Sequence, residues 1–354
     1  MGRTRRVAVT SMVAALVALT GAGPRLAAAG ESQDPLILES LNLSRQEALS
    51  YTAPNLVTES LVGHSGPLKV CGTPPPDRVS KERFDSSIAG WQSFGGANRF
   101  NGPLTIPVVF WVIQNGAGKG LVTNEQIYSQ IDVLNWAYRK AGISFYAADG
   151  WLVTNNKYYK KCGITKRSGR FNGVYKKMTK RLTRQVGVDP ATTLNIYSCN
   201  PRGGLLGEAF GAVYLEIYPN YDESHHMNGV VVHNQTLPGG NQYPYNAGAT
   251  AAHEIGHYFG LLHTFFPDEI PGMTGCDFPG DGIDDTPYEE SPAYEAVPET
   301  NCAKGRDTCP SLPKKDPVSN FMDYSSDYCQ EKFSKQQRNF MRDVIEYYRP
   351  SLIQ

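Results

Sequence analysis

Residues 252–264 read Ala-His-Glu-Ile-Gly-His-Tyr-Phe-Gly-Leu-Leu-His-Thr, and this stretch decides how the rest of the chain is organised. In a helix, residues four apart lie on one face, so His253 and His257 can direct their imidazoles at one metal ion while Glu254 lies beside it. At ordinary residue frequencies, the five fixed positions of the pattern would coincide in a chain of this length roughly once in 10⁵ sequences. Chance is therefore not a serious alternative.

A glycine and a third histidine complete the pattern. Gly260 can adopt the left-handed conformation that ends a helix, which lets His263 approach the same ion from a loop. Three protein ligands leave one coordination position open, as in catalytic zinc sites. Neutral imidazoles leave the charge of the ion uncancelled, so the pKa of a bound water falls, and Glu254 is placed to accept its proton as the water attacks a carbonyl. The sequence therefore predicts zinc-dependent hydrolysis of peptide bonds in proteins or peptides.

The pattern HExxHxxGxxH resembles that of the metzincin metalloproteases, which carry a methionine turn beneath the metal. Residues 320–324, Asn-Phe-Met-Asp-Tyr, resemble that turn. Residues 280–287 and four spaced cysteines resemble the secreted fungal and bacterial members of the pappalysin family, and the resemblance covers about residues 190–345. It implies an α+β fold with a twisted mixed sheet, an active-site helix, a Met-turn and an irregular, disulfide-braced C-terminal subdomain.

Three residues of the last third bear on catalysis and specificity. Met322 is expected to form the apolar floor of the site, because a thioether competes poorly for a zinc ion already bound by imidazoles. Tyr324 resembles the tyrosine that in some metzincins hydrogen-bonds the oxyanion, with a core tyrosine as the alternative. Some relatives that cut before Arg or Lys have Asp where this chain has Tyr328, which argues against a strict basic preference unless the neighbouring Asp327 compensates.

The acidic stretch after the third histidine is too long to lack structure in a compact domain unless something pins it. Carboxylate and hydroxyl oxygens are ligands that calcium prefers. By resemblance to the family, Asp281 and Thr286 would bind a structural calcium, with backbone carbonyls near Ile283 and Cys302 assisting. The alternative is an acidic, solvated loop.

Seven cysteines leave one over if the others pair. Cys71 is the candidate, because its Cys-Gly-Thr segment resembles a pappalysin prosegment in which the thiolate occupies the open zinc position and keeps the enzyme latent. The alternative is a disulfide from Cys71 to Cys162 or Cys199. Removal of a prosegment that contains Cys71 leaves six cysteines. The resemblance implies that Cys276 pairs with Cys309 and that Cys302 pairs with Cys329. The third expected pair is Cys162 with Cys199.

The beginning of the chain indicates secretion into the extracellular space. Residues 1–29 combine a basic start, a short apolar run and small residues, which is the pattern of a signal peptide and too short for a membrane anchor. Residues 30–80 are weakly periodic, with a possible helix over 44–50, and are predicted to be a removable prosegment. Residues 81–354 remain as the catalytic domain. Because 34 Lys and Arg balance 34 Asp and Glu, no global charge draws the chain to nucleic acid.

Periodicity predicts the regular elements of the catalytic domain. Strands are expected over 104–112, 143–146, 151–154, 193–197, 213–218 and 229–232, and helices over 124–140, 174–185 and 334–348. Residues 213–217 would be either the edge strand that pairs with extended substrate or an interior strand. Residues 157–184 contain eleven Lys or Arg and no Asp or Glu, which indicates either a solvated face or a docking patch for polyanions.

Two other classes of function compete with a protease. A pseudoenzyme would keep zinc for stability and act as an inhibitor or adhesion module, but such a site has no need of the carboxylate of Glu254. A zinc hydrolase with a substrate other than a peptide is the second alternative. An edge strand able to pair with extended substrate would count against it.

Overall fold

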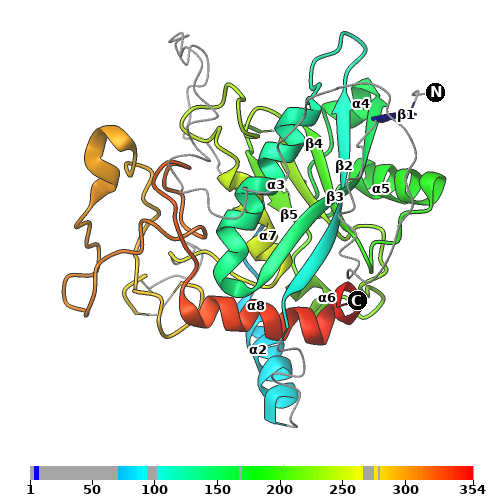
Figure 1. Cartoon of the computed structure of the whole chain (residues 1–354). Helices are drawn as coiled ribbons and strands as arrows, with labels where there is room; N and C mark the ends of the chain where they lie inside the picture. Colours follow the sequence, from blue (N-terminus) through cyan, green and yellow to red (C-terminus); the bar gives the residue numbers. More distant parts are fainter. Residues whose placement is uncertain are drawn as a thin grey trace, which may run out of the picture.

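The computed structural model describes residues 71–93, 102–166, 170–201, 203–265, 275–277 and 280–353, and the backbone of 4–7. The described chain is built around a six-stranded mixed sheet with the strand order β1-β3-β2-β4-β6-β5 (Figure 1). Its strands are β1 (Thr4–Val7), β2 (Leu104–Gln114), β3 (Ile143–Thr154), β4 (Leu194–Cys199), β5 (Gly207–Ala209) and β6 (Val230–His233).

The pairing of the strands explains their composition. β2 runs parallel to β3 and β4, and β4 runs parallel to β6, so the apolar run of β2 is buried on both faces as central parallel strands usually are. β3 is one strand where the sequence predicted two, because the register skips Ala148 and the ladder then continues. β5 is antiparallel to β6 and forms one edge. β1 lies within the predicted signal peptide and pairs with β3.

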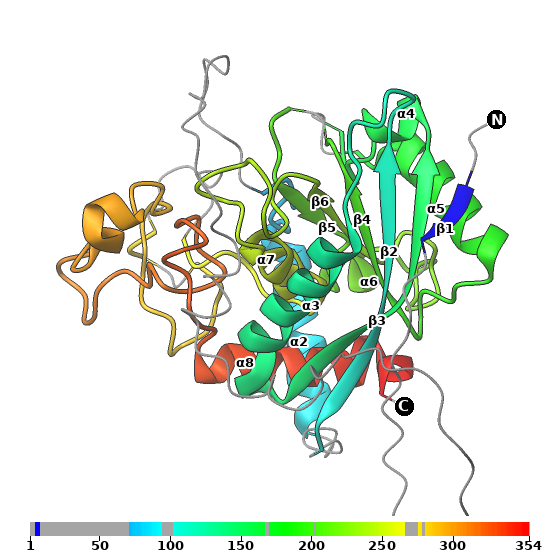
Figure 2. The same cartoon turned by 45° about the horizontal axis from the view of Figure 1, so that its top comes forward.

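Helices cover both faces of the sheet (Figure 2). α3 and α7 pack on one face, against alternate side chains of β2 such as Phe110. α5 packs on the other face, where Trp111 contacts Tyr197. The helices are α2 (Arg78–Ser93), α3 (Asn124–Tyr138), α4 (Asn156–Tyr159), α5 (Gly173–Val186), α6 (Val213–Ile217), α7 (Ala249–Tyr258) and α8 (Lys335–Tyr348). The family resemblance therefore predicted the α+β architecture correctly.

Capping residues account for the ends of the predicted helices. α3 begins at a capping box in which Thr123 and Gln126 exchange side-chain and backbone hydrogen bonds, and α8 begins at an equivalent box from Ser334. α5 ends at Gly187, whose φ of 73° is left-handed. The basic side chains of α5 are exposed and its apolar face is buried, while the docking patch for polyanions stays a prediction.

The strand predicted over residues 213–218 is wrong, because this segment forms the short helix α6. Val213, Tyr214 and Leu215 are consecutive and all buried, which a half-buried strand does not allow. The segment contacts α2, a helix that the sequence did not reveal. Five residues are too few for periodicity to separate a strand from a helix.

The C-terminal part has little regular structure before α8, as the resemblance implied. In Figure 1 this part, coloured orange, lies beside the sheet on the side away from α5. The three expected disulfides are present, and Cys71 is the free cysteine among the described residues, so its alternative disulfide to Cys162 or Cys199 is wrong. No described helix is both long and apolar enough to cross a bilayer. The possible helix over 44–50 and most of the predicted signal peptide and prosegment lie outside the described residues.

Candidate metal centre and active site

The helix that carries the histidine pattern, α7, is held by long-range contacts at its start. Its N-cap is Gly248, which has no side chain to satisfy the first backbone N–H groups. The carboxylate of Asp327 takes that role, accepting hydrogen bonds from the N–H groups of Ala247 (2.8 Å) and Ala249 (3.1 Å). A negative charge also suits the positive end of a helix. Asp327 therefore fixes α7 from a part of the chain far away in sequence.

Two hydrogen bonds orient the histidines of α7. Nδ1 of His253 lies 2.7 Å from the carbonyl oxygen of Phe321, and Nδ1 of His257 lies 2.7 Å from that of Leu261. Because a carbonyl oxygen only accepts, each Nδ1 carries the proton and each Nε2 is left with a free lone pair. Burial lowers the pKa of both imidazoles, that of His253 to about 4, so they are neutral. Neutral imidazoles with one free nitrogen are metal ligands.

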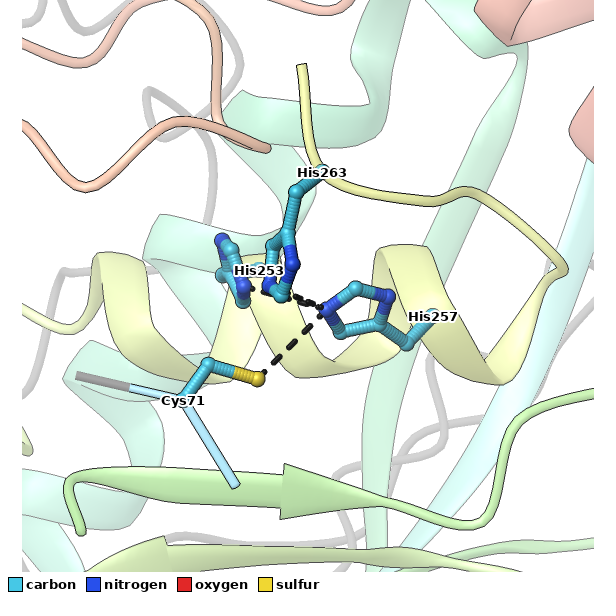
Figure 3. A group of neighbouring side chains, drawn as sticks. All are labelled: Cys71, His253, His257 and His263. Atoms are coloured by element: carbon cyan, nitrogen blue, oxygen red, sulfur yellow. Dashed lines mark hydrogen bonds between the residues drawn. The ribbon is translucent and has the colours of Figure 1, made fainter. Parts of the chain in front are cut away.

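The third histidine, His263, reaches the site through the turn that was predicted at Gly260. Gly260 has a φ of 91°, and the chain turns there so that His263 enters from the loop. Nε2 of His257 lies 3.1 Å from Nε2 of both His253 and His263, and 3.5 Å from Sγ of Cys71 (Figure 3). All four ligand atoms lie within 4.8 Å of one another. Of the described residues, these form the one such cluster of three or more His, Cys, Asp or Glu side chains.

This donor set fits a zinc ion. Facing imidazole lone pairs repel each other unless a cation lies between them, and these side chains are buried. Around a tetrahedral zinc with bonds of about 2.0–2.3 Å, neighbouring ligand atoms are roughly 3.3–3.6 Å apart, close to the separations found here. With Cys71 in place the cluster offers four protein ligands, and without it three.

Glu254 lies beside the cluster with its side chain buried. Burial raises the pKa of its carboxyl group well above the usual range, and hydrogen bonds from Cys71 and Thr73 oppose that shift. Its Oε2 accepts from the thiol of Cys71 at 3.6 Å and the hydroxyl of Thr73 at 3.0 Å, while Oε1 has no hydrogen-bond partner among the described residues. A Cβ on Gly207 of β5 would lie 2.5 Å from Cγ of Glu254, so this strand packs tightly on the carboxylate.

The segment with Cys71 occupies the edge of the sheet next to the cluster. Cys71 forms a parallel bridge with Gly207, and the N–H of Gly72 donates to the carbonyl of Gly207 at 2.8 Å. The hydroxyl of Thr73 accepts from the N–H of Ala209 at 2.7 Å while it donates to Glu254. Burial, and then the charge of Glu254, raise the pKa of the Cys71 thiol. The edge strand beside the cluster is thus β5. Residues 213–217, which were expected to form either an edge or an interior strand, form helix α6 instead.

Tyr324 and Met322 both lie against residues of the histidine pattern. The hydroxyl of Tyr324 is 3.1 Å from Nε2 of His263, and its side chain is almost fully buried. Met322 is wholly buried beneath α7, so close that a Cβ on Gly256 would lie 2.4 Å from its sulfur.

The two residues predicted to bind calcium contact each other. The carboxylate of Asp281 accepts hydrogen bonds from the N–H of Ile283 (3.0 Å), the hydroxyl of Thr286 (3.0 Å) and the amide of Gln337 (2.8 Å). Burial raises the pKa of Asp281 to about 6. Its contacts within the protein are thus made by hydrogen-bond donors, and calcium binding stays a prediction.

The side chain of Tyr328 is held by a neighbouring residue. The hydroxyl of Tyr328 donates to the side chain of Asn246 at 3.0 Å. Asp327, the alternative acidic group for a basic preference, is buried and engaged at the start of α7, and burial raises its pKa to about 7. Asp327 is thus committed to the helix.

Sequence reasoning missed two residues that shape the site. Thr73 follows the predicted Cys71, but its partners Glu254 and Ala209 are 181 and 136 residues away in sequence. Arg306 lies in the C-terminal part and makes hydrogen bonds to six groups there. No local pattern could reveal either role, because each depends on contacts that form only in the folded chain.

The chain is similar in sequence to known extracellular metalloproteases. The peptidase M43 family model, described as pregnancy-associated plasma protein-A, matches residues 184–346. An extracellular metalloprotease of Colletotrichum graminicola is 32% identical over 287 residues, covering 79% of this chain and 91% of that protein. One from Sordaria macrospora is 31% identical over 292 residues, covering 79% and 88%.

Solved structures show the same fold. A promirolysin mutant of Tannerella forsythia superposes with a TM-score of 0.57 at 22% identity, covering 80% of this chain and 97% of that one. Mature mirolysin in complex with a cleaved peptide gives a TM-score of 0.51 at 25% identity, covering 72% and 97%.

Proposed function

Since the chain belongs to the pappalysin family and is an extracellular metalloendopeptidase, we propose that His253, His257 and His263 hold a catalytic zinc ion and that Glu254 is the general base. Its substrates are proteins or peptides, as the family implies. The observation that carries the proposal is the convergence of three histidine Nε2 atoms beside a buried carboxylate. A metal site kept only for stability would not need that carboxylate.

Each residue of the site has a part in peptide hydrolysis. A bound zinc supplies an acidified water and polarises the peptide carbonyl. Glu254 takes the proton of the attacking water and passes it to the leaving amine. Its raised pKa suits the first step, because a carboxylate in a dry site accepts a proton more readily. The hydroxyl of Tyr324, 3.1 Å from Nε2 of His263, is close enough to donate to the oxyanion.

The edge of the sheet supports a peptide as substrate. β5 is a three-residue edge strand beside Glu254, and residues 71–72 already pair with its free side. An extended substrate would use the same backbone groups once this segment has left. A hydrolase for another class of substrate would have no use for such a ladder.

The same segment supports synthesis as a zymogen. Cys71 completes the ligand cluster, and a thiolate is a good zinc ligand. Thr73 donates to Glu254, so the segment engages the proposed base as well as the metal position. The proposed latent form therefore needs the prosegment to leave before substrate can enter.

Removal and return of the metal test the proposal. We expect the mature protein to cleave a mixed peptide library, a chelator to abolish cleavage, and one equivalent of Zn²⁺ to restore it. A mature protein that cleaves peptides equally fast with the chelator, or that never cleaves them with zinc bound, would contradict the proposal.

A further inference from the structure

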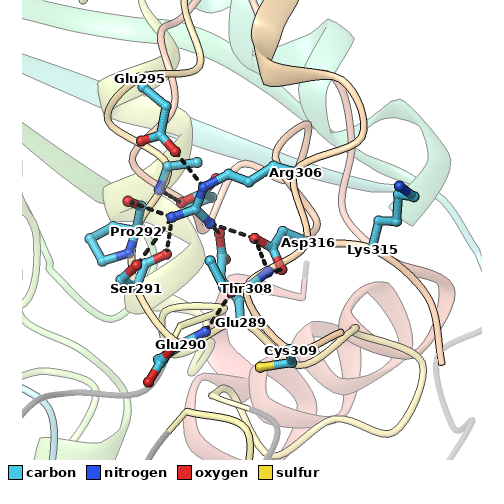
Figure 4. A network of polar contacts seen from close by, with 12 residues as sticks. Glu289, Glu290, Ser291, Pro292, Glu295, Arg306, Thr308, Cys309, Lys315 and Asp316 are labelled. Atoms are coloured by element: carbon cyan, nitrogen blue, oxygen red, sulfur yellow. Dashed lines mark hydrogen bonds and ion pairs between the residues drawn. The ribbon is translucent and has the colours of Figure 1, made fainter. Parts of the chain in front are cut away.

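Arg306 is the centre of a polar network in the C-terminal part (Figure 4). Its Nη1 donates to the carboxylates of Glu289 (2.9 Å) and Asp316 (2.6 Å), and its Nε donates to Glu295 (2.5 Å). Its Nη2 donates to the carbonyl oxygen of Ser291 at 2.9 Å. The guanidinium therefore ties residues 289–295 to the chain that leads to Asp316.

This network is buried where it approaches the active site. The Glu289 and Asp316 side chains are 0% and 1% exposed, and that of Arg306 is 11% exposed. Burial and the nearby charge of Asp323 raise the pKa of Glu289, and the charge of Arg306 opposes that shift. Removing one partner of a buried ion pair leaves a charge without compensation, so the network depends on Arg306.

One branch of the network reaches the third histidine. The second oxygen of Glu289 accepts from the hydroxyl of Thr264 at 2.9 Å, and Thr264 directly follows His263. Thr264 is wholly buried, and a Cβ on Gly280 would lie 2.3 Å from its carbonyl oxygen. The chain after His263 therefore has little freedom to move while Glu289 stays in place.

A second branch reaches the tyrosine. The N–H of Ala293 donates to Oδ1 of Asp323 at 3.0 Å, and that same oxygen accepts from the N–H of Tyr324 at 2.6 Å. The rings of Tyr294 and Tyr324 lie 5.5 Å apart. The segment fixed by Arg306 thus contacts both the loop of His263 and the turn of Tyr324.

We propose that Arg306 is a positioning residue for catalysis: it fixes residues 289–295, and that segment holds His263 and Tyr324 in their relative geometry. The inference rests on the proposed function of those two residues. A planar guanidinium can direct its N–H groups at several fixed acceptors at once, whereas a lysine ammonium is a flexible point charge. Arg306→Lys keeps the charge and removes this geometry.

The test compares Arg306→Lys with Arg338→Lys, a matched change of an arginine on α8 that donates to the carbonyl of Phe333. The mature proteins are assayed for kcat and KM on one peptide, and their Co²⁺-substituted forms for the visible absorption spectrum, which reports ligand geometry. We expect Arg306→Lys to lower kcat roughly 10-fold or more with KM within about twofold, and to shift the cobalt spectrum. Arg338→Lys should match the parent in both.

Thr264→Val supplies a second, milder variant that cuts the branch to His263 without touching Arg306. It should change kcat and the cobalt spectrum in the same direction, and the double variant should be no worse than Arg306→Lys alone, because both changes break one path. If Arg306→Lys fails to fold, Thr264→Val alone decides. Normal kcat and a parental cobalt spectrum in the folded variants, even with a lower melting temperature, would overturn the proposal. If the parent itself cleaves no peptide, the proposed function fails, and the cobalt spectra still decide the role of Arg306.

Discussion

The hydroxyl of Thr73 makes two hydrogen bonds beside the histidine cluster. It donates to Glu254 and accepts from the N–H of Ala209. A buried polar group that loses its partner costs about 1–3 kcal/mol, and here one side chain satisfies two such groups. In the proposed latent form, Thr73 therefore stabilises the docked segment in addition to Cys71.

Thr73→Val should raise the peptidase activity of the uncleaved protein. Valine has nearly the same shape but no hydroxyl, so Glu254 and Ala209 both lose a hydrogen bond. A loss of about 1.4 kcal/mol corresponds to roughly a tenfold larger open fraction. The measurement is the peptidase activity of the full-length, uncleaved protein, with its intact length verified by mass spectrometry.

Two variants bracket this result. Thr73→Ser keeps the hydroxyl and should stay close to the parent, whereas Cys71→Ala removes the fourth candidate ligand and should shorten latency further. A Thr73→Val zymogen as silent as the parent would show that the hydroxyl does not contribute to latency.

Among the structural elements, the contact between β5 and α7 fixes the position of the Glu254 carboxylate. Gly207 lets the strand approach the carboxylate of Glu254 so closely that no side chain fits between them. Asp327 holds the start of α7 through hydrogen bonds to its backbone. The helix is thus fixed by neighbours and not by its own propensity.

Gly207→Ala should reduce kcat without removing zinc. The added methyl group must displace the Glu254 side chain, and a shift of about 1 Å in a catalytic group can cost roughly 100-fold in rate. The histidines lie outside this contact, so the zinc content of the mature variant should stay near one equivalent. A peptide-cleavage assay and a metal analysis on the same sample measure kcat and the zinc content.

Gly173→Ala is the matched control, since nothing lies within 4 Å of a Cβ added at that position. It should leave kcat unchanged. Equal kcat values for Gly207→Ala and Gly173→Ala would mean that the base does not depend on the β5 contact.

Elements with a strong period and a clear cap were predictable from sequence. β2, α3 and α8 lie close to where the apolar pattern predicts them, and in the structure Thr123 and Ser334 cap the two helices. The short helix α6 was not predictable, since its five residues have no decisive period and follow their contact with α2. The C-terminal part owes its order to disulfides and to Arg306, which are long-range contacts without a local pattern.

At the scale of the whole molecule, the predicted boundary between prosegment and catalytic domain falls within a helix. The predicted boundary after residue 80 lies inside α2, whose Phe84 stacks on Tyr348 of α8 at 5.1 Å. Phe84 and Ile88 are buried, so most of α2 is part of the folded domain. A cut that frees Cys71 without unfolding the domain must therefore lie between Thr73 and Phe84.

The N-terminus of the mature protein checks this. We expect N-terminal sequencing of the active form to start within residues 74–83, because that removes Cys71 and Thr73 and retains the buried face of α2. An active, stable form that begins after Ser93 would show that α2 is dispensable.

The most direct test of the account is a pair of measurements on mature Glu254→Gln: zinc content and peptide cleavage. An amide keeps the shape of the side chain but cannot take a proton, and Glu254 is not in the ligand cluster. The account predicts one equivalent of zinc, as in the parent, and a kcat lower by orders of magnitude. A variant that holds zinc and cleaves peptides as fast as the parent would contradict the claim that Glu254 is the base beside a metal held by three histidines.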